Sequence, residues 1–187
     1  MSTDWGLRSA PIPNERSRMT RHQHWRCKAA LLAGLIVTPC TSSTPPVLAA
    51  LCTGGNASAR VGATLDHVRR PAGPALAALQ GSSFQIGFTF VTPDSASHAS
   101  KASGSSCSGS HGTATFSGAI PEPVRNAASA DGRASWQVQD DSVLIDLNPR
   151  VRDSNVFLTL PLDGGRGHWG LSTFAGEVAG GHTDLAP

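Results

Sequence analysis

The stretch FQIGFTFV at residues 84–91 decides the fold class of this chain. Its large apolar residues recur at every second position, with small or polar residues between them: Phe84, Ile86, Phe88 and Phe90. Strict alternation of this kind predicts a half-buried β-strand, because successive side chains of a strand point to opposite faces of a sheet. This is the strongest structural signal in the sequence.

Weaker strand patterns follow towards the C-terminus. Short strands are predicted at 113–116 and 135–138, and the β-branched and leucine runs VLIDL (143–147) and VFLTL (156–160) predict two more. After the turn at 163–165, HWGLSTFAG (168–176) is predicted to be the final strand. Short strands separated by turn residues predict a mainly β fold, a small antiparallel sandwich or barrel, after an N-terminal signal helix.

An export signal is predicted near the N-terminus. Arg21, Arg26 and Lys28 precede nine unbroken apolar or glycine residues at 29–37, and small residues surround Ala49 and Ala50. This is the three-part pattern of a secretory signal, so cleavage is expected after Ala49 or Ala50. The n-region begins at about residue 19, which leaves Met1 and Met19 as alternative starts. A retained membrane helix is disfavoured because it needs about 20 apolar residues.

Lipid attachment is the main alternative fate for this segment. A bacterial lipoprotein signal places a cysteine after a short apolar stretch, with a small residue before it. Cys40 follows Pro39, and Cys52 follows the bulky Leu51. Both departures make anchoring as a lipoprotein the weaker expectation.

Two of the four cysteines are expected to form a disulfide. Cys27 and Cys40 lie within the signal, whereas Cys52 and Cys107 would remain after cleavage. An even pair in an oxidising compartment favours a disulfide, which would contribute on the order of 3–4 kcal/mol by closing a long loop.

The composition divides the chain into three segments. Residues 1–49 hold an upstream extension and the signal, 50–83 are interpreted as a small-residue linker with one short helical turn, and 84–187 as an antiparallel β-domain with a flexible Ser/Gly loop at 93–111. The arginine-over-lysine bias is a weak compositional indication of a bacterial source.

The charge distribution argues against nucleic-acid binding. The 187 residues carry a net charge of +2, but the positive excess lies within residues 1–49. The remainder is slightly acidic and has no basic stripe that could follow a phosphate backbone.

No catalytic, cofactor-binding or metal-binding residues are predicted. Ser106 and His111 lie close in sequence, but GSSCS (104–108) lacks the second glycine of a nucleophile elbow. The carboxylates Asp140, Asp141 and Asp146 are interpreted as a turn and a solvent-facing strand position rather than a glycosidase pair. The histidines outside the signal have no ligand-like spacing: His67, His98, His111, His168 and His182.

One patch remains as a candidate for ligand contact. Arg166, His168 and Trp169 follow a predicted turn and combine contact area with hydrogen-bonding capacity. The competing interpretation places Trp169 in the core, as is usual for a tryptophan in a strand.

The leading functional hypothesis is an exported β-domain, secreted or held in the periplasm or cell envelope, that binds without catalysis. Its partner would be another envelope protein, a glycan or a small ligand, and membrane contact is expected only through the signal or a lipid anchor. One alternative is a small secreted hydrolase assembled from Ser106, His111 or His168 and an aspartate. A second is a structural envelope subunit that pairs through a strand edge.

Overall fold

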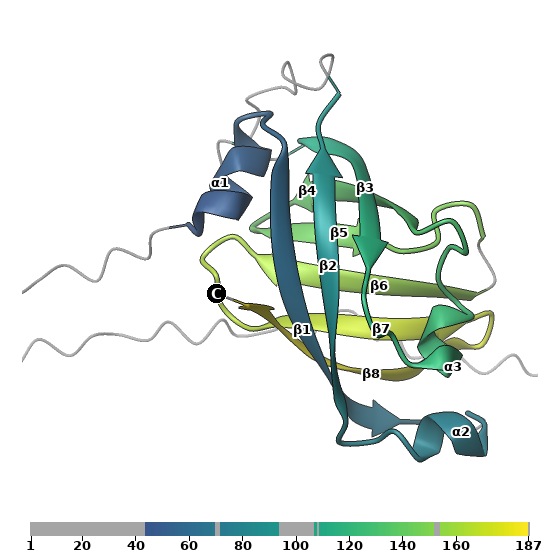
Figure 1. Cartoon of the computed structure of the whole chain (residues 1–187). Coiled ribbons are helices and arrows are strands. Elements are labelled where there is room, and N and C mark those ends of the chain that lie inside the picture. Colours follow the sequence, from purple (N-terminus) through teal and green to yellow (C-terminus); the bar gives the residue numbers. More distant parts are fainter. Residues whose placement is uncertain (1–43, 70–71, 94–106, 108, 152–153, 187) are drawn as a thin grey trace, which may run out of the picture. The chain divides into compact units, whose positions relative to one another are not determined.

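The computed structural model describes residues 44–69, 72–93, 107, 109–151 and 154–186. Eight antiparallel strands join in sequence order into a closed barrel, because the last strand pairs with the first (Figure 1). The strands are β1 (Ala57–Val68), β2 (Ser83–Val91), β3 (His111–Ser117), β4 (Arg133–Gln139), β5 (Ser142–Asp146), β6 (Ser154–Pro161), β7 (Gly167–Thr173) and β8 (Gly176–Ala186). Of the predicted architectures, the antiparallel barrel is therefore confirmed and the sandwich is not.

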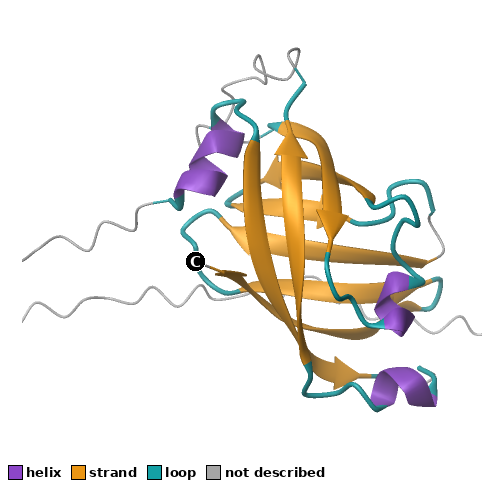
Figure 2. Cartoon of the chain, in the orientation of Figure 1, coloured by secondary structure: helices purple, strands orange, loops and turns teal. Residues whose placement is uncertain are grey.

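The described residues also form three short helices beside the barrel strands (Figure 2). They are α1 (Pro46–Cys52), α2 (Pro74–Ala77) and α3 (Glu122–Arg125), each with a proline in its first turn, where the missing N–H is not needed. Helix α1 packs against β1 and buries Leu48 and Leu51 completely. The predicted signal at 29–37 lies outside the described residues.

The predicted strand at 84–91 is confirmed as β2. Phe84, Ile86, Phe88 and Phe90 are all buried, and the residues between them are exposed or half-buried. The other predicted strands correspond to β3, β4, β5, β6 and β7.

The barrel interior is filled with side chains. The largest fully buried ones include Trp136, Trp169 and Phe90, and Phe90 packs edge-on against Trp136 with ring centroids 6.2 Å apart. Eight strands enclose a space that side chains of this size can fill. Any ligand site among the described residues therefore has to be sought on the outer wall or at the ends of the barrel.

The structure differs from the sequence expectation at the first and last strands. Residues 57–68, interpreted as part of a linker, form β1, and β8 follows the strand that was expected to be the last. Both contain small residues and glycine, which have low intrinsic β-propensity. They become strands because they pair with each other over Arg60↔Ala186 to Val68↔Ala179 and so close the barrel.

The predicted disulfide joins Cys52 to Cys107, with 4.6 Å between their Cα atoms. It ties the end of α1 to the β2–β3 connection. Part of the predicted flexible loop at 93–111 is therefore attached to the barrel, since Cys107 is buried and Ser110 donates its N–H to the Cys107 carbonyl at 3.2 Å.

Candidate functional site

The candidate site is a group of polar side chains on the outer wall where β7, β8 and β1 lie side by side. Its centre is the carboxylate of Glu177 on β8, which contacts His67 of β1 and His168 of β7. We call these three residues the Glu177 cluster.

Two β-bulges place the Glu177 cluster on the outer wall. In β1, Val61, Ala63 and Leu65 face inwards, and regular alternation would turn His67 inwards as well. The β1–β8 register shifts between Leu65 and His67, so the extra residue Asp66 lets His67 point outwards.

A second bulge does the same for Glu177. Ala179 and Thr183 of β8 are fully buried, so residue 177 would share their inward direction in an unbroken strand. The β7–β8 register shifts between Leu171 and Ser172, and Glu177 pairs with Ser172. Bulges often re-aim a side chain next to a functional site. Here two of them bring a carboxylate and an imidazole together.

Glycines provide the space that the carboxylate occupies. A Cβ atom on Gly170 would lie 2.6 Å from Oε2 of Glu177, and one on Gly180 would lie 3.2 Å from its Oε1. Gly170 and Gly180 are direct partners across β7 and β8. The carboxylate therefore lies low over the sheet, with 21% of the side chain exposed.

Each carboxylate oxygen of Glu177 has one imidazole partner. Nε2 of His67 lies 2.9 Å from Oε1, and Nε2 of His168 lies 3.1 Å from Oε2. A neutral histidine that donates its Nε2–H to a carboxylate keeps Nδ1 as an acceptor. Both rings are partly exposed, so these acceptors can take part in contacts with a ligand.

A second polar group adjoins the cluster. His182 lies directly opposite His168 across β7 and β8, and its Nδ1 is 2.7 Å from Oδ2 of Asp66. Asp184 contacts Arg166 at 3.4 Å and approaches Nε2 of His182 at 3.7 Å. Three imidazoles and three carboxylates thus share one surface with the guanidinium of Arg166.

Two carboxylates of this surface, Glu177 and Asp66, have a lowered pKa. Burial acts to raise the pKa of Glu177, but the hydrogen bonds and charges of His168 and His67 outweigh it and lower the pKa below its usual value. The hydrogen bond from His182 lowers the pKa of Asp66 in the same way, against a smaller effect of desolvation. With the imidazoles left out of the count, the side chains that contact one another on this surface comprise three carboxylates and the guanidinium of Arg166.

The structure divides the predicted ligand patch. His168 belongs to the Glu177 cluster, and Arg166 reaches the same wall through Asp184. Trp169 points into the barrel, is fully buried and donates its indole N–H to the Thr64 carbonyl at 2.8 Å. The interpretation of Trp169 as a core residue is confirmed by its complete burial.

The residues considered for hydrolysis do not form a catalytic group in the part of the chain that is described. His111 lies on β3, where its Nδ1 contacts the Gly109 carbonyl at 3.1 Å. Asp146 accepts the backbone N–H of Asn148 at 2.8 Å, and Asp140 lies in the β4–β5 turn with a positive φ of 52°. Ser106 and His98 lie outside the described residues. Among the described histidines, His168 contacts the Thr159 hydroxyl only through its backbone N–H and carbonyl, at 3.0 and 3.2 Å, while its ring contacts Glu177.

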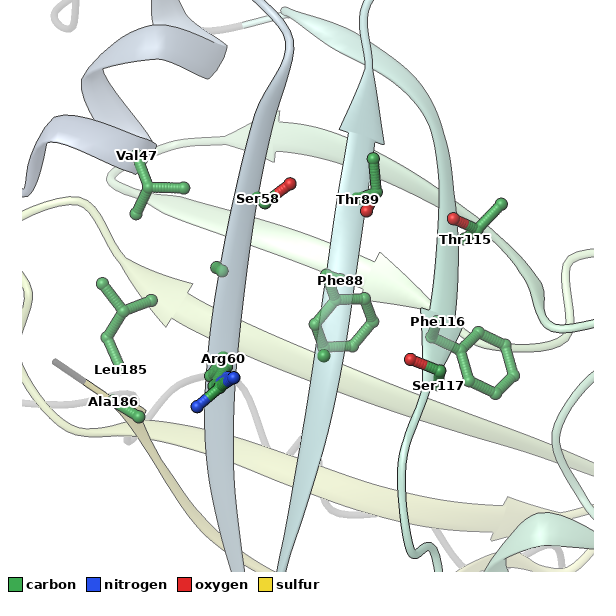
Figure 3. A pocket seen from close by; sticks show the side chains of 12 residues that line it. Val47, Ser58, Arg60, Phe88, Thr89, Thr115, Phe116, Ser117, Leu185 and Ala186 are labelled. Atoms are coloured by element: carbon green, nitrogen blue, oxygen red, sulfur yellow. The ribbon is translucent and has the colours of Figure 1, made fainter.

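A shallow groove lies elsewhere on the outer wall, across β1, β2 and β3 (Figure 3). Its volume is about 690 Å³, and it is lined by small polar side chains such as Ser58, Thr89 and Thr115 together with Arg60. It contains no imidazole or carboxylate. The groove can form hydrogen bonds, but it lacks the acid–base groups of the Glu177 cluster.

Sequence reasoning identified His168 and Arg166 but missed His67, Glu177 and Asp66. The pairing that brings these residues together joins segments more than a hundred residues apart. The local sequence therefore shows only histidine and acidic residues in glycine-containing segments.

Comparison with known proteins assigns no relative. Among the described residues, no group of three or more histidine, cysteine or carboxylate side chains is arranged to hold a metal ion. None of the helices formed by the described residues is long and apolar enough to span a membrane. No protein-family model matches the chain, and no curated protein or solved structure is significantly similar to it.

Proposed function

We propose that this chain is an exported, disulfide-bonded β-barrel that binds a partner through the outer wall around Glu177 and performs no catalysis. The observation that carries the proposal is the construction of the site. Two bulges and two glycines accommodate one ionised carboxylate between two histidines. A carboxylate with no role beyond solubility would not need this arrangement.

The charge of the wall indicates the chemistry of the partner. Glu177, Asp66 and Asp184 lie on it, Arg166 is paired with Asp184, and His67 and His168 contact Glu177 through Nε2, which leaves their Nδ1 atoms for a ligand. Such a surface suits a partner that presents basic or hydrogen-bond-donating groups. Among the partners expected from the sequence, another envelope protein with exposed lysines or arginines fits best.

Export is supported by the predicted signal and by the Cys52–Cys107 disulfide, since disulfides persist in oxidising compartments. Helix α1 refines the expected processing. A cut after Ala49 or Ala50 would divide α1 and remove Leu48, which is fully buried. We therefore place the cut upstream of Pro46. The intact mass of the exported protein tests this, and a chain beginning at residue 50 or 51 would contradict it.

The two alternatives receive less support. A hydrolase needs a nucleophile within reach of a histidine that a carboxylate orients. Among the described residues, Glu177 orients the ring of His168, but no nucleophilic side chain is hydrogen-bonded to that ring. A subunit that pairs through a strand edge needs a free edge, whereas all eight strands are paired on both sides.

The binding proposal is tested with Glu177→Gln, which keeps the size of the side chain and removes its charge. Glu122→Gln on α3 is the matched control. Crosslinking of each exported variant in the cell envelope should give the same specific adduct for the wild type and Glu122→Gln, and a strongly reduced one for Glu177→Gln. Equal adduct yield from Glu177→Gln would refute this site.

A further inference from the structure

The groove across β1, β2 and β3 has exposed hydroxyl side chains on its floor (Figure 3). Ser58 lies opposite Thr89, and Thr89 lies opposite Thr115, so the three form one row across the strands. All three are exposed, and within the described part of the chain their hydroxyls form no hydrogen bond. Elsewhere on the same wall, the hydroxyls of Thr64 and Ser83 bond to each other at 2.9 Å. The row therefore keeps its donors and acceptors for a ligand.

The next row of the floor contains a gap. Gly87 lies between Arg60 on β1 and Ser117 on β3, and it has no side chain to fill the space. Its φ is not positive, and a Cβ atom there would lie 3.6 Å from Oγ of Ser117, an ordinary contact distance. Neither backbone conformation nor crowding thus requires glycine at this position. Glycine within a strand often marks a place where a ligand approaches closely.

Arg60 supplies a guanidinium without a partner beside this gap. Three other described arginines each contact an aspartate: Arg133, Arg150 and Arg166. Arg60 is exposed and forms no ion pair or side-chain hydrogen bond with another described residue. No carboxylate lines the groove. On the neighbouring strand β8, Asp184 lies two residues from the partner of Arg60, but it contacts Arg166 at 3.4 Å and His182 at 3.7 Å. The groove therefore offers one positive charge that no lining residue offsets.

Apolar side chains border the hydroxyl floor. Figure 3 shows Val47 of α1 and Leu185 of β8 on one side of the groove and Phe116 of β3 on the other. All three are partly buried against the core, so they are held in place while part of each remains accessible. Ligand sites commonly combine such apolar surface with a few polar groups that fix orientation.

We propose that this groove is a second binding site, and that it takes an acidic oligosaccharide whose sugar rings carry carboxylates. Arg60 pairs with a sugar carboxylate above Gly87. The hydroxyl row exchanges hydrogen bonds with sugar hydroxyls, which are donors and acceptors of the same kind. The apolar borders contact the C–H faces of the rings. This site is separate from the Glu177 cluster and does not rest on the function proposed for it.

The lining of the groove favours a saccharide over other ligands. A stable protein interface has a well-packed apolar core, whereas this floor is made of hydroxyls. A nucleic acid needs several cations along its phosphates, and Arg60 is the only cation that lines the groove. A neutral sugar would leave the charge of Arg60 unused.

The test is a titration of the isotope-labelled exported chain, followed by NMR. The probe is tetragalacturonate, and its matched control is the fully methyl-esterified form, which keeps the sugar rings and removes the negative charges. Tetragalacturonate should shift the amide signals of Arg60, Gly87 and Ser117. The ester should bind about tenfold more weakly, because it replaces a charge-assisted hydrogen bond with a neutral one.

Three variants locate the ligand. Gly87→Ala places a methyl group in the gap, so it should weaken binding about tenfold, while its ordinary contact distance leaves the Tm unchanged. Gly62→Ala adds a methyl group to the same strand outside the groove and should bind like the wild type. Arg60→Gln should bind the acid no better than the ester.

Four outcomes would overturn the proposal. These are shifts confined to other strands, equal affinity for acid and ester, full binding by Gly87→Ala, and saturation of the same amides by inorganic sulfate as tightly as by tetragalacturonate. The last would show a site for simple anions only. Glu177→Gln should leave this titration unchanged, so the two binding proposals can fail independently.

Discussion

The inner and outer walls of the barrel follow different rules within the same three strands. On β7, Trp169 faces inwards, where it lies over Gly181 of β8 and donates to the Thr64 carbonyl. Its neighbour His168 faces outwards and contacts Glu177. The side chains on the inner wall are apolar and closely packed. Those on the outer wall of these strands are polar and hydrogen-bonded to one another. If the outer wall binds a partner as proposed, the contrast predicts that stability and binding can be changed separately in this protein.

The inner wall should show the largest effect. Trp169→Ala is expected to destabilise the barrel by about 3–5 kcal/mol, because it removes a fully buried aromatic side chain and leaves a cavity. His168→Ala, one residue away, should cost far less. Urea denaturation measures both free energies of unfolding, and similar losses for the two would contradict the division between the walls.

Filling the space that the Glu177 carboxylate occupies should cause the second-largest loss of stability. Gly170→Ala would bring a methyl group to 2.6 Å from both Oε2 of Glu177 and Cζ of Phe157, so we expect a loss of about 1–3 kcal/mol from overpacking. Gly62→Ala on β1 is the control, since its new methyl would contact only the Asp184 carbonyl, at 3.8 Å. Thermal unfolding should show a lower Tm only for Gly170→Ala.

The charge of Glu177 gives a smaller effect that depends on pH. Its pKa is lowered in the folded state, so the ionised carboxylate stabilises the fold above the unfolded-state pKa. This stabilisation is lost as the pH falls through the lowered folded-state pKa. Glu177→Gln should therefore be less stable than the wild type at neutral pH and lose that difference in strong acid. A constant difference in urea denaturation across this range would contradict the assigned role of the charge.

The exposed ion pair should give the smallest effect. Arg166→Ala removes a contact with Asp184 in which both side chains are more than half exposed, so stability should change by about 0.5 kcal/mol or less. If Arg166 instead contacts the partner, the same variant should weaken binding. Measuring unfolding and partner crosslinking on one preparation distinguishes these contributions.

The central strands of this fold were readable from the sequence, and the closing strands were not. Phe84 to Phe90 show strict alternation because one face of β2 is buried in an apolar interior. In β1 and β8, glycine and alanine occupy positions where neighbouring strands approach closely, or, like Gly181, lie under the side chain of Trp169. The apolar period there is weak. The disulfide was predictable because Cys52 and Cys107 are the two cysteines outside the predicted signal.

By itself, the sequence predicted that the chain is mainly β and favoured a disulfide between Cys52 and Cys107, and it placed His168 and Arg166 among the candidates. These features depend on local alternation or on residue chemistry. Only the tertiary structure decided that the sheet closes, that Trp169 belongs to the interior, and that Glu177 lies between His67 and His168. The physical reason is that closure and both bulges arise from pairing β8 with its neighbours, and β1 precedes β8 by more than a hundred residues. No local pattern records that pairing.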